Sequence, residues 1–171
     1  MKSKTCCFTG HRILSAEQTQ ALAGRIERAV RLLYTRGVCY FGAGGALGFD
    51  MLAAETVLRL REELPALRLI LVLPCRDQAG RFPASQRARY EAILRQADKI
   101  VYTADTYAPG CMHLRNRHLA DESAYCLCYL TSARGGTKYT VDYCLAHGVK
   151  VCNLALGDLS SDCFFDGGSE G

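Results

Sequence analysis

The sequence predicts one α/β domain with a Rossmann-like three-layer fold, in which a mostly parallel sheet of about six strands lies between helices. Short runs of β-forming residues alternate with amphipathic stretches along the chain, which is the pattern of repeated βαβ units. The run from Leu67 to Leu73 is almost entirely apolar, as expected for a strand buried on both faces of a parallel sheet. A chain of 171 residues suffices for one such domain.

Each element has its own local signal. Ser15 and Gln18 fit an S-x-x-Q capping box, Gly37 suits the end of the helix that follows, and Pro65 marks the end of the next helix. The expected helices therefore run from the capping box to Gly37, then over residues 51–64, 85–96, 112–122 and 137–147. The expected strands cover residues 5–9, 38–41, 67–73, 99–102, 125–130 and 149–154.

Composition and charge argue against a membrane protein and give no support by themselves to a nucleic-acid binder. A net charge of +4 is too small to indicate a nucleic-acid binder by itself, but it suits an anionic small ligand. No apolar run approaches the roughly 20 residues of a membrane span, and the N-terminus has no signal-peptide pattern. We expect a cytoplasmic protein with no membrane partner. Residues 1–156 form the expected domain, and residues 157–171 form an acidic tail containing Gly and Ser, loosely ordered apart from a docking of Phe164-Phe165.

Ten cysteines raise the question of disulfides or metal. Most of them fall inside apolar runs, where a free cysteine behaves as a small hydrophobic residue. Cys126 and Cys128 would share one face of a strand, but no further Cys or His stands at a recognisable metal-ligand spacing. We expect structural thiols in a reducing compartment, with no metal site and no cofactor.

The candidate site follows from the strand ends. In a parallel sheet, ligands bind beyond the carboxyl ends of the strands, at a topological switch point. Most of the segments that follow the strands carry Gly, Arg or both, so we expect one anion-binding cleft at this edge. The expected ligand-binding residues are Thr9, Gly10, His11, Arg12, Gly42, Gly44, Gly45, Gly48, Asp50, Arg76, Arg115, Asn116, Gly135, Gly136 and Thr137.

Several of these residues leave alternatives open. The glycine loop 42–50 suits a phosphate cradle at a helix start, or is a turn that only joins strand to helix. Its spacing matches neither a P-loop nor the usual dinucleotide fingerprint. Arg12 suits bidentate phosphate binding or a salt bridge, and Asp50 suits a ribose contact or a helix cap. Of Arg115 and Arg117, at most one is expected to face the ligand while the other forms a salt bridge.

Taken together, these segments resemble a known family. Thr9-Gly10-His11-Arg12, Gly44 to Asp50, Arg115-Asn116-Arg117 and Gly135 to Val141, in this order, resemble the YpsA-like branch of the bacterial SLOG superfamily over about residues 5–154. The resemblance implies a Rossmann-like domain that binds nucleotides or nucleotide-derived ligands at the glycine loops. Relatives of the superfamily commonly dimerise, so a homodimer is also implied.

The resemblance also suggests two alternative functions. LOG phosphoribohydrolases carry Pro-Gly-Gly-x-Gly-Thr-x-x-Glu, and the Glu position falls on Asp142 here, while Lys138 and Tyr139 replace the second Gly and the Thr. Asp142 would be the catalytic residue of a nucleotide N-glycosidase. The superfamily also includes the DNA-processing protein A that loads recombinase on single-stranded DNA, so the resemblance implies a single-strand nucleic-acid binder as the other alternative, but this chain lacks a basic stripe with interleaved aromatic residues. Binding or sensing of a nucleotide or an ADP-ribose-like ligand is therefore the expected function, with nucleic acid unlikely.

Overall fold

The computed structural model describes residues 1–159 and contains one six-stranded sheet in which every strand is parallel. The strand order is β4-β3-β2-β1-β5-β6, which confirms the predicted Rossmann-like class. The strands are β1 (Thr5–Gly10), β2 (Tyr40–Ala43), β3 (Arg68–Leu73), β4 (Lys99–Tyr102), β5 (Tyr125–Tyr129) and β6 (Lys150–Asn153).

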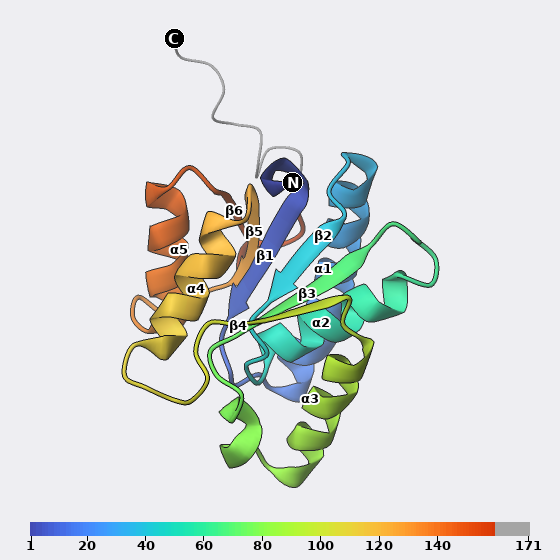
Figure 1. Cartoon of the computed structure of the whole chain (residues 1–171). Coiled ribbons are helices and arrows are strands. Elements are labelled where there is room, and N and C mark those ends of the chain that lie inside the picture. Colours follow the sequence, from blue (N-terminus) through green and yellow to red (C-terminus); the bar gives the residue numbers. More distant parts are fainter. Residues whose placement is uncertain (160–171) are drawn as a thin grey trace.

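Five helices cover the two faces of the sheet. They are α1 (Ala16–Thr35), α2 (Phe49–Leu60), α3 (Ala84–Gln96), α4 (Cys111–Asp121) and α5 (Gly136–Ala146). Helices α1, α2 and α3 pack on one face, whereas α4 and α5 lie together on the other (Figure 1). Three short 3-10 helices, at Lys2–Lys4, Gln78–Arg81 and Leu154–Leu156, were not predicted.

Local signals explain the ends of α1. The Ser15 hydroxyl accepts from the backbone N–H of Gln18 at 3.0 Å, and the Gln18 side chain accepts from the Ser15 N–H at 2.8 Å. This confirms the predicted capping box. Gly37 follows the helix with φ of 90°, the left-handed conformation expected of the residue that ends a helix.

The predicted boundaries of β2 and α2 were wrong by two residues or more. Gly42 and Ala43 belong to β2, because they continue the pairing with Ile70 and Leu71 of β3. Helix α2 begins at Phe49 rather than Met51 and ends at Leu60. The glycine loop is therefore shorter than expected and consists of residues 44–48.

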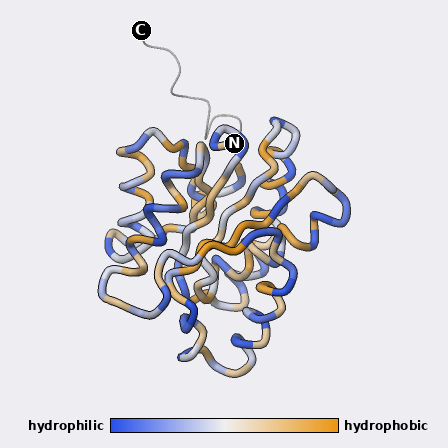
Figure 2. The backbone as a smooth tube through the Cα atoms, viewed as in Figure 1, coloured by the Kyte–Doolittle hydropathy of each residue, from blue (hydrophilic) through white to orange (hydrophobic). Residues whose placement is uncertain are grey.

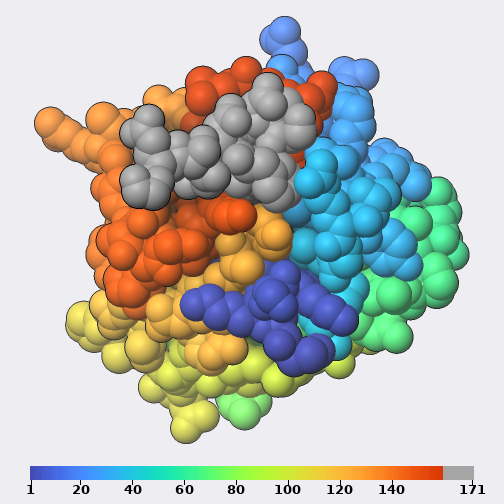
Figure 3. Space-filling model, turned by 90° about the horizontal axis from the view of Figure 1, so that it is seen from above, coloured from blue at the N-terminus to red at the C-terminus, as the bar shows by residue number. Residues whose placement is uncertain are grey.

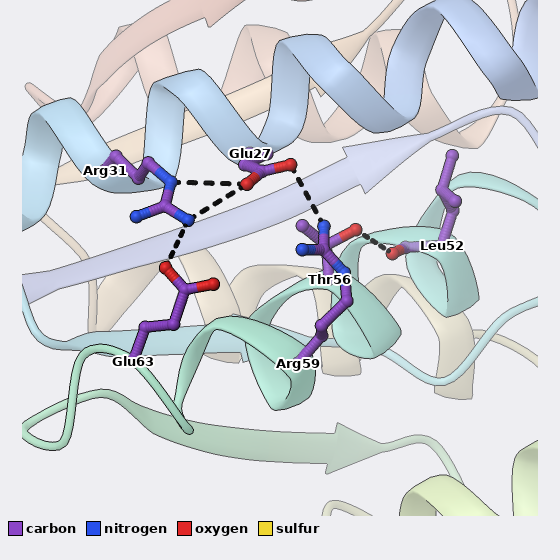
Figure 4. A network of polar contacts seen from close by, with 6 residues as sticks. All are labelled: Glu27, Arg31, Leu52, Thr56, Arg59 and Glu63. Carbon is purple, nitrogen blue, oxygen red and sulfur yellow. Dashed lines mark hydrogen bonds and ion pairs between the residues drawn. The ribbon is translucent and has the colours of Figure 1, made fainter.

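Helices α1 and α2 are joined by a charged network on their outer surfaces (Figure 4). Glu27 of α1 accepts from Arg31 and from Arg59 of α2, each at 3.1 Å, and Arg31 also pairs with Glu63 at 2.7 Å. These bonds lower the pKa of Glu27, because Arg59 and Arg31 stabilise its charged form. The network is solvent-accessible, so we expect it to set the packing angle more than the stability.

Apolar residues gather in the strands and on the helix faces that touch them (Figure 2). The nine cysteines in the described part of the chain are all free, and eight of them are buried, as predicted; Cys163 lies outside the described residues. So does the predicted docking of Phe164-Phe165. None of the helices within residues 1–159 combines the length and apolar character that a membrane crossing needs.

The strand order fixes where a site belongs. The chain moves outward from β1 through β2 and β3 to β4, then returns to place β5 on the other side of β1. The switch point therefore lies between the carboxyl ends of β1 and β5. In Figure 1 the strands run downward, so this edge is the lower one. Figure 3 views the opposite edge, where the N-terminal residues (dark blue) lie between segments coloured gold and cyan.

Candidate functional site

A polar hollow of about 200 Å³ lies at this switch point. The loops after β1 and β5, the first turn of α4 and the start of α5 surround it. Ten of the fifteen predicted ligand-binding residues line it, as do four residues outside that prediction. The lining residues are Thr9, Gly10, His11, Arg12, Ala46, Asp50, Met112, His113, Arg115, Asn116, Arg134, Gly135, Gly136 and Thr137.

The loop after β1 supplies one wall. The Nε2 atom of His11 accepts from the backbone N–H of Thr131 at 2.9 Å, so the neutral ring carries its proton on Nδ1. This bond ties the β1 loop to the β5 loop across the switch point. Arg12 is exposed beside the hollow, and within residues 1–159 its guanidinium has no hydrogen-bond or ion-pair partner. Its charge favours the charged form of the nearby Asp50, but a guanidinium with no direct hydrogen bond or ion pair is available to an anionic ligand.

Ala46 of the glycine loop 44–48 lines the hollow, but the glycines of this loop serve packing. Gly48 precedes α2 with φ of 76°, and a Cβ built there would stand 2.6 Å from the carbonyl oxygen of His11. The N–H of Phe49 donates to that same oxygen at 3.1 Å. A Cβ at Gly45 would stand 2.6 Å from the Leu73 side chain. The loop thus needs glycine because the β1 loop and β3 approach it closely.

The Asp50 carboxylate occupies the place next to the loop's backbone N–H groups where a phosphate was expected. Its carboxylate is buried and accepts from the backbone N–H of Ala46 at 3.4 Å. Burial raises the pKa of Asp50, although Arg115 and the backbone N–H groups of the loop favour its charged form. The N–H groups that were expected to cradle a phosphate therefore face a carboxylate of the protein itself.

Arg115 connects this carboxylate to α4. It is 4% exposed, and its guanidinium donates to the carbonyl oxygen of Gly44 and, through Nε, to the Asn116 side chain at 2.6 Å. Arg117 instead donates to the Tyr139 hydroxyl at 3.1 Å. Arg115 lines the hollow and Arg117 does not, and Arg117 forms a hydrogen bond rather than the expected salt bridge.

The second glycine loop, residues 135–137, is open where the first is closely packed. A Cβ built at Gly135 or Gly136 would meet no atom within 4 Å, so both glycines leave open space in front of α5. The first N–H groups of α5, including that of Thr137, have no partner within the helix. Arg134 stands beside them, exposed, and its guanidinium has no hydrogen-bond or ion-pair partner in the described part of the chain. Sequence reasoning left Arg134 out of the site, although its place directly before two glycines was a usable signal.

Other predicted residues lie outside the hollow. Gly42, Gly44, Gly45 and Gly48 do not line it. A Cβ at Gly42 would stand 2.9 Å from the Leu119 side chain, and one at Gly44 would collide with the Arg115 guanidinium. Arg76 lies over the Tyr102 ring and pairs with Asp105 at 3.6 Å.

The proposed catalytic carboxylate is also outside. Asp142 is on the exposed side of α5, where it pairs with Lys138 at 2.5 Å. It does not line the polar hollow in which most of the predicted ligand-binding residues meet.

Comparisons with known proteins identify the family. The family model YpsA, described as the YspA SLOG family, matches residues 8–150. The chain belongs to this SLOG family. It is 31% identical over 126 residues to a UPF0398 protein of Oceanobacillus iheyensis, covering 72% of this chain and 68% of the relative. It is 27% identical to a UPF0398 protein of Bacillus pumilus, covering 86% of this chain and 84% of the relative.

A solved structure supports the fold independently. The structure of DNA processing protein A from Helicobacter pylori, a protein with a single-stranded DNA binding mode, superposes with a TM-score of 0.64. The match covers 88% of this chain and 64% of that protein, at 19% identity. This likeness confirms the Rossmann-like fold of the YpsA-family chain.

The buried Asp50 gives this YpsA-family protein a distinctive pH dependence. Because its folded pKa lies above the unfolded value, its contribution to stability is fully present below the unfolded pKa, about 4, and is lost as pH rises through the folded pKa. We expect Asp50→Asn to remove this loss, so that the variant gains stability relative to the natural protein as pH rises from 4 to 7. Urea unfolding at several pH values measures it; parallel stability curves would contradict the prediction.

Proposed function

We propose that this protein binds a nucleotide or a nucleotide-derived ligand, such as a nucleoside phosphate or an ADP-ribose-like molecule, and acts as a binding or sensing module. The phosphate lies against the open N-terminus of α5, between Arg12 and Arg134. The observation that carries the proposal is the pair of exposed arginines without hydrogen-bond or ion-pair partners in the described chain, beside unobstructed N–H groups.

The surroundings favour a ligand larger than phosphate. A second hollow, of about 430 Å³, shares Arg12, Ala46 and Met112 with the first. Phe82 and Tyr107 also line it, and they offer aromatic surface to a base. A nucleotide would occupy both hollows, with its phosphate in the polar hollow and its base in the larger one.

A thermal-shift panel tests the proposal. Nucleoside mono- and diphosphates and ADP-ribose are compared with adenosine and with a short single-stranded oligonucleotide, which the structural neighbour makes a fair alternative. We expect a phosphate-bearing small molecule to raise the melting temperature, and adenosine not to. A rise with the oligonucleotide alone, increasing at low salt, would contradict the proposal.

Arginine substitutions locate the ligand. We expect Arg12→Ala and Arg134→Ala each to weaken binding roughly 10- to 100-fold, since each removes a charge-assisted hydrogen bond worth about 1.5–3 kcal/mol. Arg76→Ala is the matched control, because this exposed arginine pairs with Asp105 outside the hollow. Calorimetric titration measures the affinities. If all three variants lost the same affinity, the effect would come from the net charge of the protein and not from contacts in the hollow, which would contradict the proposal. An assay for released base in the same samples tests the glycosidase alternative.

A further inference from the structure

Three buried cysteines meet on the face of the sheet that α5 covers, away from the polar hollow. Cys7 of β1 and Cys126 of β5 are register partners on neighbouring strands, and Cys144 of α5 lies over them. The three sulfur atoms all lie within 4.8 Å of one another, and each residue is 0% exposed.

The fold explains how the three thiols come together. Cys6 and Cys7 are adjacent on β1, so they point to opposite faces: Cys6 joins the core beneath α1 and α2, whereas Cys7 faces α5. Cys126 and Cys128 share the α5 face of β5, as the C-x-C spacing predicted. The cluster therefore combines residues from three elements, of which β1 is far from β5 and α5 in the sequence.

We propose that Cys7, Cys126 and Cys144 form a three-sulfur binding site for a soft monovalent cation, Cu⁺. Thiolates are the ligands that soft ions prefer, and three sulfurs at the corners of a triangle match the trigonal coordination that Cu⁺ accepts. With metal–sulfur bonds of about 2.3 Å, as for zinc thiolates, the sulfurs of a planar site would stand about 4 Å apart. Small side-chain rotations therefore close the site from its present spacing.

The surroundings select against Zn²⁺. Structural zinc takes four ligands, but within residues 1–159 no fourth Cys, His or carboxylate joins the three sulfurs. Leu119, Val141 and Val149 pack in the same cluster, and the polar group beside Cys7 is the Ser123 hydroxyl, which is not among the ligands that structural zinc uses. A three-coordinate ion satisfies its preference without a fourth ligand.

Entry of the ion requires α5 to move. Two of the sulfurs belong to the sheet and the third to α5, so local displacement of this helix opens the site to solvent. Each thiol that becomes a ligand releases its proton to water. Once bound, the ion joins α5 to β1 and β5 and stabilises the folded chain.

Competition with a coloured Cu⁺ chelator tests the site on the full-length, reduced protein under anaerobic conditions. We expect the protein to withdraw one Cu⁺ per chain, with X-ray absorption showing a shell of three sulfurs. Cys144→Ala removes one ligand and is expected to weaken binding roughly 100-fold or more. Cys128→Ala is the matched control. This buried cysteine lies on β5 and on the same face as Cys126, but it does not belong to the group of three sulfurs.

Each outcome decides the proposal. Equal binding by Cys144→Ala and the natural chain would overturn it, as would a shell of two sulfurs. Tight retention of Zn²⁺ by the natural chain but not by Cys144→Ala would overturn the choice of ion. Circular dichroism checks that Cys144→Ala folds, and Cys126→Ser provides a second test of the same ligand set if it does not.

Discussion

Replacing Gly48 by alanine is expected to destabilise the protein by about 3 kcal/mol or more, lowering its melting temperature by about 6–12 °C. The new Cβ would stand 2.6 Å from the carbonyl oxygen of His11 and would also collide with that of Arg12, on a backbone whose φ of 76° already disfavours a side chain. The His11 carbonyl accepts from the N–H of Phe49 at the start of α2, so it cannot turn away without losing this bond.

Gly80→Ala is the matched control for this change. No atom lies within 4 Å of a Cβ built at Gly80, and its φ is not left-handed, so we expect little change in stability. Differential scanning calorimetry compares the two variants. Equal melting temperatures would mean that the glycine loop is not packed against the β1 loop as described.

Replacing Arg115 by methionine is expected to cost about 3 kcal/mol, although methionine keeps much of the side-chain volume. The change takes the Arg115 donor away from the buried carbonyl of Gly44, which keeps only the Gln78 side chain at 3.4 Å, and removes a positive charge from beside the buried carboxylate of Asp50. Urea unfolding at pH 7 measures the loss. Arg117→Met on the same helix gives up only a bond to a partly buried hydroxyl and should cost about 1 kcal/mol or less.

A double substitution isolates the charge effect. Asp50→Asn removes the negative charge that Arg115 stabilises. Arg115→Met should therefore lower the free energy of unfolding less in an Asp50→Asn background than in the natural protein. Additive losses in the double variant would show that the two side chains act independently, and would leave only the lost bond to Gly44.

Much of the fold was readable because its signals are local. The capping box at Ser15 and Gln18 and the helix end at Gly37 depend only on neighbouring residues, and both are confirmed. The alternation of strands and helices likewise fixed the sheet class. The short 3-10 helix at Gln78–Arg81 was missed because its residues are ordinary loop residues with no periodic pattern.

The site was only partly readable, because one residue type serves two purposes. Glycine is needed where a ligand approaches the backbone and equally where another chain segment does, so loops 44–48 and 135–137 look alike in the sequence. The structure separates them: Gly48 meets carbonyl oxygens, whereas Gly136 meets open space. Whether the carboxylate of Asp50 faces the loop or a ligand depends on tertiary packing.

Pairings between distant residues were also invisible. Arg76 follows β3 at the predicted edge, yet its side chain pairs with Asp105, which belongs to a loop whose path the sequence does not fix. Cys7, Cys126 and Cys144 show no metal-ligand spacing, and only the pairing of β1 with β5 beneath α5 brings them together. Sequence spacing finds sites built within one segment and misses those assembled from three.

The central claim is that a phosphate-bearing ligand binds at the open glycine loop before α5 and not at the filled loop before α2. Amide chemical shifts of the ¹⁵N-labelled protein, followed while the best nucleotide of the thermal-shift panel is added, test this most directly. We predict that the amides of Gly135, Gly136 and Thr137 shift with ligand concentration, while those of Gly44 and Gly45 remain in place. Saturable shifts at Gly44 and Gly45, with none at residues 135–137, would contradict it.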